Sequence, residues 1–158
     1  MSTKRIVPAI LVAWLGTAAM AAQTAPDFSG NWVLDRTASV LQAESAVVES
    51  GTVRIEHRDP AFRFARTFVV KQQPVDTAFD IATDGREVAR AVAGRTSRSR
   101  LEWQGRSLLL TVLIDTPRGE VSNIVRYELL DGGKTLRAIE DVGGAAPTHH
   151  NIWIFVRR

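Results

Sequence analysis

Asp27-Phe28-Ser29-Gly30-Asn31-Trp32-Val33-Leu34 is the stretch that decides the fold. A small turn is expected to end at Gly30, and a first strand then runs from Asn31 to about Asp35 with Trp32 turned inward. From there to the last residue the chain alternates short strands and turns. We therefore expect Trp32 to close one end of a β-barrel.

The residues before this stretch have the pattern of a removable export signal. Lys4 and Arg5 form a positive start, residues 6–15 are apolar, and small residues at 19–22 offer a cleavage point. The apolar run is shorter than the roughly 20 residues that a membrane span needs, although a membrane anchor is the alternative. We expect a signal peptide at 1–22 and a mature domain at 23–158, periplasmic or secreted in a bacterium, with no membrane span after cleavage.

The charge and the cysteine content of the sequence argue against some classes of function. The chain carries 20 basic and 17 acidic residues, and removal of Lys4 and Arg5 leaves 18 (20 minus 2) against 17. The arginines are scattered, so no nucleic-acid partner is expected. There is no cysteine, so no disulfide can form and core packing alone must stabilise the domain. No catalytic motif is present, which favours a non-enzymatic protein.

The hydrophobic period becomes two residues from Thr52 onward, as in half-buried strands. Short turns separate the alternating segments, and Asp84-Gly85 predicts a two-residue hairpin. The connections are too short for helical crossovers, so neighbouring strands should pair antiparallel. We expect an all-β, up-and-down meander barrel of about 8–10 strands, with an open sheet or sandwich as the alternative. Residues 107–115 are apolar on both faces and predict a central strand covered on both sides.

Residues 36–50 contain neither Gly nor Pro. They predict one short helix or loop after the first strand, with Thr37 as a possible cap. We expect this segment to form the mouth of any pocket.

Phe28-Ser29-Gly30-Asn31-Trp32 resembles the Gly-x-Trp signature of the first strand of calycins, the lipocalins, fatty-acid-binding proteins and their relatives. Arg157 or Arg158 stands where those barrels have a basic residue packed over the tryptophan. Ile55-Glu56-His57 and the turns at 83–86 and 131–136 are similar to small exported bacterial proteins called lipocalin-like, which carry no assigned chemistry. The resemblance implies structural roles for Gly30, Trp32 and Arg157.

The chain also departs from those families. No helix is expected after the barrel. The expected last strand lacks the Arg-x-Tyr pair with which fatty-acid-binding proteins bind a carboxylate, so fatty acid is not the default ligand. A weaker similarity to nitrobindin, a haem barrel, places His149 or His150 near that protein's haem ligand.

The apolar strand faces carry a few polar side chains that would point inward, where an unpaired polar group costs about 1–3 kcal/mol. Glu140 and one of the two neighbouring histidines belong to this set. If Arg66 points inward it needs an anion, either Glu140 or a ligand carboxylate; otherwise its head reaches the rim. The candidate ligand-binding residues are His57, Phe64, Arg66, Phe79, Trp103, Asn123, Tyr127 and Trp153.

Three hypotheses follow. The leading one is an exported barrel, monomer or homodimer, that binds a small hydrophobic or amphipathic molecule without a cofactor. The second is a haem or metal barrel using His149 or His150; only one of the two can face inward, and with His57 that falls below the usual three or four zinc ligands. The third is a filled barrel that serves as a structural or interaction domain.

Overall fold

The computed structural model describes residues 25–158, so the expected signal peptide lies outside the described residues. No helix of this part is long and apolar enough to cross a membrane. The elements are β1 (Gly30–Leu34), η1 (Ala43–Val47), β2 (Val48–Arg58), β3 (Ala61–Val70), β4 (Gln73–Ala82), β5 (Val88–Val92), β6 (Arg95–Gln104), β7 (Ser107–Thr116), β8 (Gly119–Leu130), η2 (Asp131–Gly133), β9 (Thr135–Gly144) and β10 (His149–Arg157), where η marks a short 3₁₀ turn.

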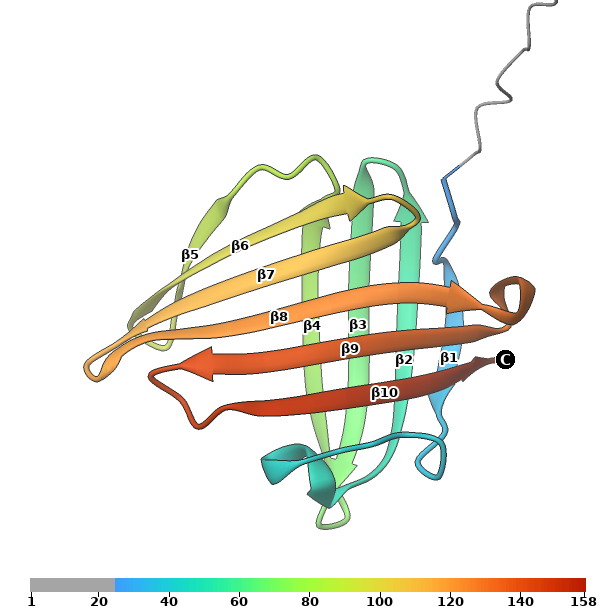
Figure 1. Ribbon diagram of the computed structural model, residues 1–158, viewed down its shortest axis with the longest axis horizontal. Coiled ribbons are helices and arrows are strands. Elements are labelled where there is room, and N and C mark those ends of the chain that lie inside the picture. Colours follow the sequence, from blue (N-terminus) through green and yellow to red (C-terminus); the bar gives the residue numbers. More distant parts are fainter. Residues whose placement is uncertain (1–24) are drawn as a thin grey trace, which may run out of the picture.

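All ten strands form one antiparallel sheet in the order β4-β3-β2-β1-β10-β9-β8-β7-β6-β5. The first and last strands pair, with Trp32 opposite Arg157 and Leu34 opposite Phe155. In Figure 1, β1–β4 run behind β6–β10 and cross them steeply. The expected up-and-down, all-β meander is confirmed, as a nearly closed barrel with a gap between β4 and β5.

The gap exists because residues 83–87 do not make the predicted hairpin. Asp84 bridges to Glu102 on β6, and the Gly85 amide donates to the Leu101 carbonyl at 2.9 Å. The Thr83 amide is held by the Pro60 carbonyl at 2.8 Å. The chain therefore passes from β4 to the end of β6 before β5 begins, and β5 pairs only with β6.

Strand alternation places the core as the sequence predicts. Val53 and Ile55 are 2% exposed and Phe62 is 1% exposed, while their outward neighbours are exposed. Farther along β3 from Phe62, Phe68 stacks on Trp153 with ring centroids 4.9 Å apart. Aromatic packing thus fills the space beside β1, β2 and β10.

Trp32 closes the seam between the first and last strands. The indole is completely buried and its N–H donates to the Phe28 carbonyl at 3.2 Å. The Arg157 guanidinium lies 4.2 Å from the ring centre and donates to the carbonyls of Gly133 and Ser29. The basic residue expected over this tryptophan is therefore Arg157. Gly30 has φ of +148°, and a Cβ there would collide with that guanidinium.

The segment after β1 is not an α-helix. The Asp35 carboxylate accepts hydrogen bonds from the Thr37 and Ala38 amides, which makes a turn. Val40 then pairs with Ile152 of β10 through two backbone hydrogen bonds of 2.8 and 2.9 Å. We call residues 36–47 the strap, because they lie across the lower end of the barrel in Figure 1.

The expectation that residues 107–115 are covered on both sides is wrong. Leu108 and Leu110 of β7 are buried, but the outward Leu109 and Leu113 are only half-buried. Leu109 lies between Glu102 and Arg126 on the neighbouring strands. The aliphatic stems of such long side chains provide partial cover, so a second layer is not needed.

Replacing Arg157 with alanine tests the seam. We expect Arg157→Ala to lower the free energy of unfolding by about 1–2 kcal/mol, because a cation–π contact and two charged hydrogen bonds are lost. Chemical denaturation measures this. Arg158→Ala is the matched control. Arg158 is exposed, and its replacement should change the free energy of unfolding by less than about 0.5 kcal/mol. Equal effects of the two substitutions would contradict the assignment.

Candidate functional site

The barrel is hollow on the side of β4, β6 and β7. A cavity of about 370 Å³ lies there, within the range of roughly 300–1,000 Å³ that is usual for small-molecule sites. Five of the predicted ligand-binding residues line it, together with aliphatic side chains and a group of hydroxyls. The predicted ones are Phe64, Arg66, Phe79, Asn123 and Tyr127, and the hydroxyls are those of Thr77, Ser97 and Ser99.

The cavity reaches the gap between β4 and β5. Its lining includes Ala78 and Asp80 on one edge and Arg90 and Val92 on the other. The Arg90 guanidinium crosses the gap and donates to the Asp80 carbonyl at 2.8 Å. No lining residue comes from residues 36–50, so the expectation that this segment forms the mouth is wrong.

Arg66 points into the barrel and not to the rim. It shares the inward face of β3 with Phe64 and Phe68, and its guanidinium carbon lies 4.7 Å from the centre of the Phe68 ring. Within residues 25–158 it forms no ion pair and no side-chain hydrogen bond. A half-buried cation whose charge meets only an aromatic ring among residues 25–158, with no hydrogen bond or ion pair, is available to an anionic ligand.

The Glu140 carboxylate lines the same cavity, and it accepts hydrogen bonds from uncharged side chains. Its Oε1 accepts a hydrogen bond from the Asn123 amide at 2.9 Å. Its Oε2 accepts from the Asn151 amide and from the Trp153 indole, both at 2.9 Å. The network continues to the strap, because Asn151 Oδ1 accepts from the Gln42 amide at 2.7 Å. One interior carboxylate thus connects β8, β9, β10 and the strap.

Tyr127 supplies a neutral hydroxyl to the cavity. Burial raises the pKa of this phenol well above its usual value; the nearby Arg66 charge opposes that rise and the Glu140 charge adds to it. The hydroxyl therefore stays protonated at neutral pH and can donate a hydrogen bond. It forms none with residues 25–158, so it too is available to a ligand.

His57 and Trp103 lie elsewhere, at the closed end of the barrel. The His57 ring is nearly buried, with centroids 5.9 Å from Phe28 and 5.7 Å from Trp103. The pKa of the Asp59 carboxyl is lowered mainly by a hydrogen bond from the Thr83 hydroxyl and, second, by one from the Trp103 indole. These contacts join the N-terminal segment to β2 and β6, and neither predicted residue lines the cavity.

The remaining candidates are also outside the cavity. Trp153 lines only a void of about 30 Å³ beside it and is packed against Phe68. His150 is exposed and its Nδ1 lies 2.7 Å from Asp141 Oδ1, while His149 Nδ1 lies 3.2 Å from the Pro147 carbonyl. Residues 25–158 contain no group of three or more metal-binding side chains. The haem or metal hypothesis stays a prediction. Neither His149 nor His150 lines the cavity.

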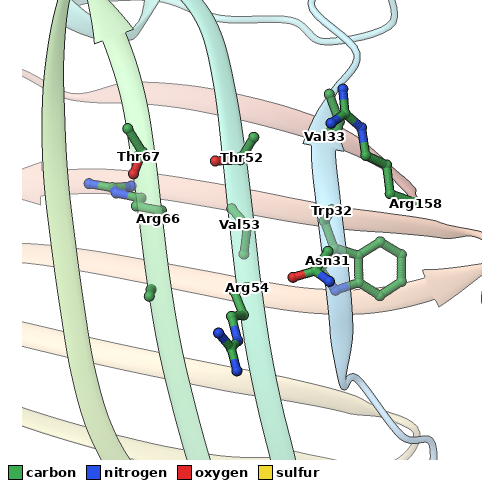
Figure 2. A pocket seen from close by; sticks show the side chains of 10 residues that line it. Asn31, Trp32, Val33, Thr52, Val53, Arg54, Arg66, Thr67 and Arg158 are labelled. Atoms are coloured by element: carbon green, nitrogen blue, oxygen red, sulfur yellow. The ribbon is translucent and has the colours of Figure 1, made fainter.

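A second hollow, of about 460 Å³, lies across β1, β2 and β3 (Figure 2). Asn31, Thr52 and Arg54 line it and are exposed, so it is a groove on the outer surface. It encloses no interior space, and we do not assign it a ligand.

Asn151 is the interior residue that the sequence interpretation missed. It is completely buried, and its three partners lie on the strap and on β9. Alternation with Trp153 and Phe155 places it inward, so the signal was present in the strand pattern. Its partners were not readable, because they come from segments more than 100 positions away or from another strand.

Replacing Asn151 tests the link between the strap and the cavity. Asn151→Leu leaves the Gln42 amide and part of Glu140 without partners, so we expect a loss of about 1–3 kcal/mol in unfolding free energy. Hydrogen exchange should also become faster in residues 36–47. Asn31→Leu, at an exposed asparagine of β1, is the control. Unchanged exchange in the strap would show that the Asn151 network does not hold it.

Comparison with known proteins supports the fold. No family profile and no curated protein matches the sequence. Among solved structures, lipid binding protein 8 of Caenorhabditis elegans has a TM-score of 0.59 at 14% identity, over 83% of this chain and 95% of its own. Secretory abundant heat soluble protein 4 of Ramazzottius varieornatus has 0.57 at 12%, over 87% and 99%.

A fatty acid binding protein of Schistosoma mansoni in complex with arachidonic acid has a TM-score of 0.52 at 20% identity, over 83% of this chain and 96% of its own. At these identities the likeness shows the fold alone. The chain thus has the fold of the calycin-like barrels, as the Gly-x-Trp stretch predicts.

Proposed function

We propose that this protein reversibly binds one small amphipathic acid in the cavity of its barrel. The observation that carries the proposal is Arg66, a cation without a protein counter-ion in residues 25–158, facing a cavity with an aromatic and aliphatic lining. The Tyr127 hydroxyl lines the same cavity and can donate to the same carboxylate. The apolar part of the ligand would pack against Phe64, Phe79 and Leu110.

In this proposal, Arg66 and Tyr127 take the place of the Arg-x-Tyr pair that the last strand lacks. Here an arginine of β3 and a tyrosine of β8 offer the same two kinds of donor from different strands. The Schistosoma mansoni barrel was solved with arachidonic acid, and this supports an amphipathic acid as the class to test. The proposal includes export: residues 1–22 would direct the protein to the periplasm or the medium, where it would carry its ligand in water.

Removing the cation is the direct test. We expect Arg66→Ala to weaken binding of dodecanoic acid by about ten- to a hundredfold, because a charge-assisted hydrogen bond is lost in a partly desolvated site. Isothermal titration calorimetry on the purified protein, stripped of bound lipid, measures this. Arg63→Ala is the matched control, since Arg63 lies on the same strand and its side chain is 68% exposed on the outer face.

A neutral ligand separates charge recognition from general damage. Dodecanol should bind wild type and Arg66→Ala with similar affinity. A large fall in melting temperature for Arg66→Ala would assign the arginine a structural role. If neither ligand binds the wild-type protein, the barrel does not carry amphipathic molecules, and the structural or interaction domain becomes the better explanation.

A further inference from the structure

Two opposite charges face one cavity without pairing with each other. Arg66 and Glu140 line the same space, and no ion pair joins them. The protein groups that contact Glu140 are neutral: two amides and an indole. A carboxylate in a partly desolvated site is stabilised best when a charged or strongly donating group meets it. Glu140 therefore has hydrogen-bond donors but no counter-ion among residues 25–158.

The two oxygens of Glu140 are unequally used. Oε2 accepts two hydrogen bonds, from Asn151 and Trp153, whereas Oε1 accepts one, from Asn123. A carboxylate oxygen has room for about two donors. Oε1 therefore keeps one acceptor position, on a half-buried residue that lines the cavity.

Asn123 adds to the acceptor character of this wall. Its amide nitrogen donates to Glu140, which fixes the orientation of the amide, because the reverse orientation would place two acceptors together. Asn123 Oδ1 is buried and accepts no hydrogen bond from residues 25–158. Asn123 Oδ1 lies beneath the cavity surface, so the acceptor that the β8–β9 wall offers to a ligand is Glu140 Oε1, whereas Arg66 and Tyr127 offer donors.

We infer that Glu140 is a specificity-determining residue, and that the preferred ligand is an amphipathic acid with a second polar group that donates a hydrogen bond. The acid would lie toward Arg66, and a hydroxyl or ammonium group of the same molecule would donate to Glu140 Oε1. A plain fatty acid would place hydrocarbon against that oxygen and leave its acceptor position unused. This inference rests on the proposed function, because it concerns the same cavity.

The test is a ratio of affinities within each variant. Dodecanoic acid is compared with monohydroxydodecanoic acids that differ in the hydroxyl position, and with an amino-substituted dodecanoic acid, so that the hydroxyl and ammonium donors are distinguished. In the wild type we expect at least one donor-bearing acid to bind about tenfold tighter than the plain acid. Glu140→Gln should reduce this preference and Glu140→Leu should abolish it.

Glu128→Gln is the matched control, because Glu128 lies on the outer face of β8, hydrogen-bonded to Arg137. Its ratio should equal that of the wild type. A change in stability alone would shift the affinities of all ligands together and leave the ratio unchanged. If the donor-bearing acids and dodecanoic acid bind with equal affinity, in the wild type and in the variants alike, the role of Glu140 is overturned and the proposed function remains intact. Failure of every acid to bind would instead overturn the proposed function.

A measurement on the wild type does not depend on whether the Glu140 variants fold. The Trp153 indole N–H donates to Glu140 and has its own proton resonance. A donor-bearing acid that reaches Glu140 should shift that resonance more than dodecanoic acid does at equal occupancy. Equal shifts would show that Glu140 serves only to anchor the strap through Asn151.

Discussion

The pairing of the first strand with the last is the constraint on which the barrel depends. β4 and β5 follow each other in sequence but do not pair, so among residues 25–158 the β1–β10 seam is where strand pairing joins β1–β4 to β5–β10. Trp32 and Arg157 lie opposite each other in this seam and stack. The last strand is thus fixed against the first, and this contact sets how the two groups of strands are aligned across the interior.

This alignment divides the interior into a filled part and a hollow part. Beside the seam, Phe68, Trp153 and Phe155 are stacked and leave little space. Away from it, toward the gap between β4 and β5, smaller side chains such as Ser97 and Ser99 line the larger cavity. The charged groups lie between the two parts, since Arg66 and Glu140 border both the void and the cavity. A ligand in the cavity would therefore meet its polar partners where the solid core begins.

Strand alternation predicted the inward face of nearly every strand, because side-chain direction depends only on local parity. It identified Phe64 and Tyr127 as inward before their neighbours were known, and it placed Arg66 on the same face while leaving open whether its head reaches the rim. It did not show that His57 and Trp103 belong to the closed end, because height in the barrel depends on the stagger between distant strands. Asp84-Gly85 illustrates the same limit: its local preference for a hairpin was overridden by hydrogen bonds to β6.

The unpaired edge of β4 also bears on whether two copies of this protein can pair edge to edge. An exposed strand edge can add a strand from another molecule and so start aggregation. Here Pro74 has no amide hydrogen to offer, and Asp76 and Asp80 would bring like charges together if two such edges met antiparallel. The sequence of the strand that borders the opening of the cavity thus disfavours pairing of this edge with the same edge of a second copy.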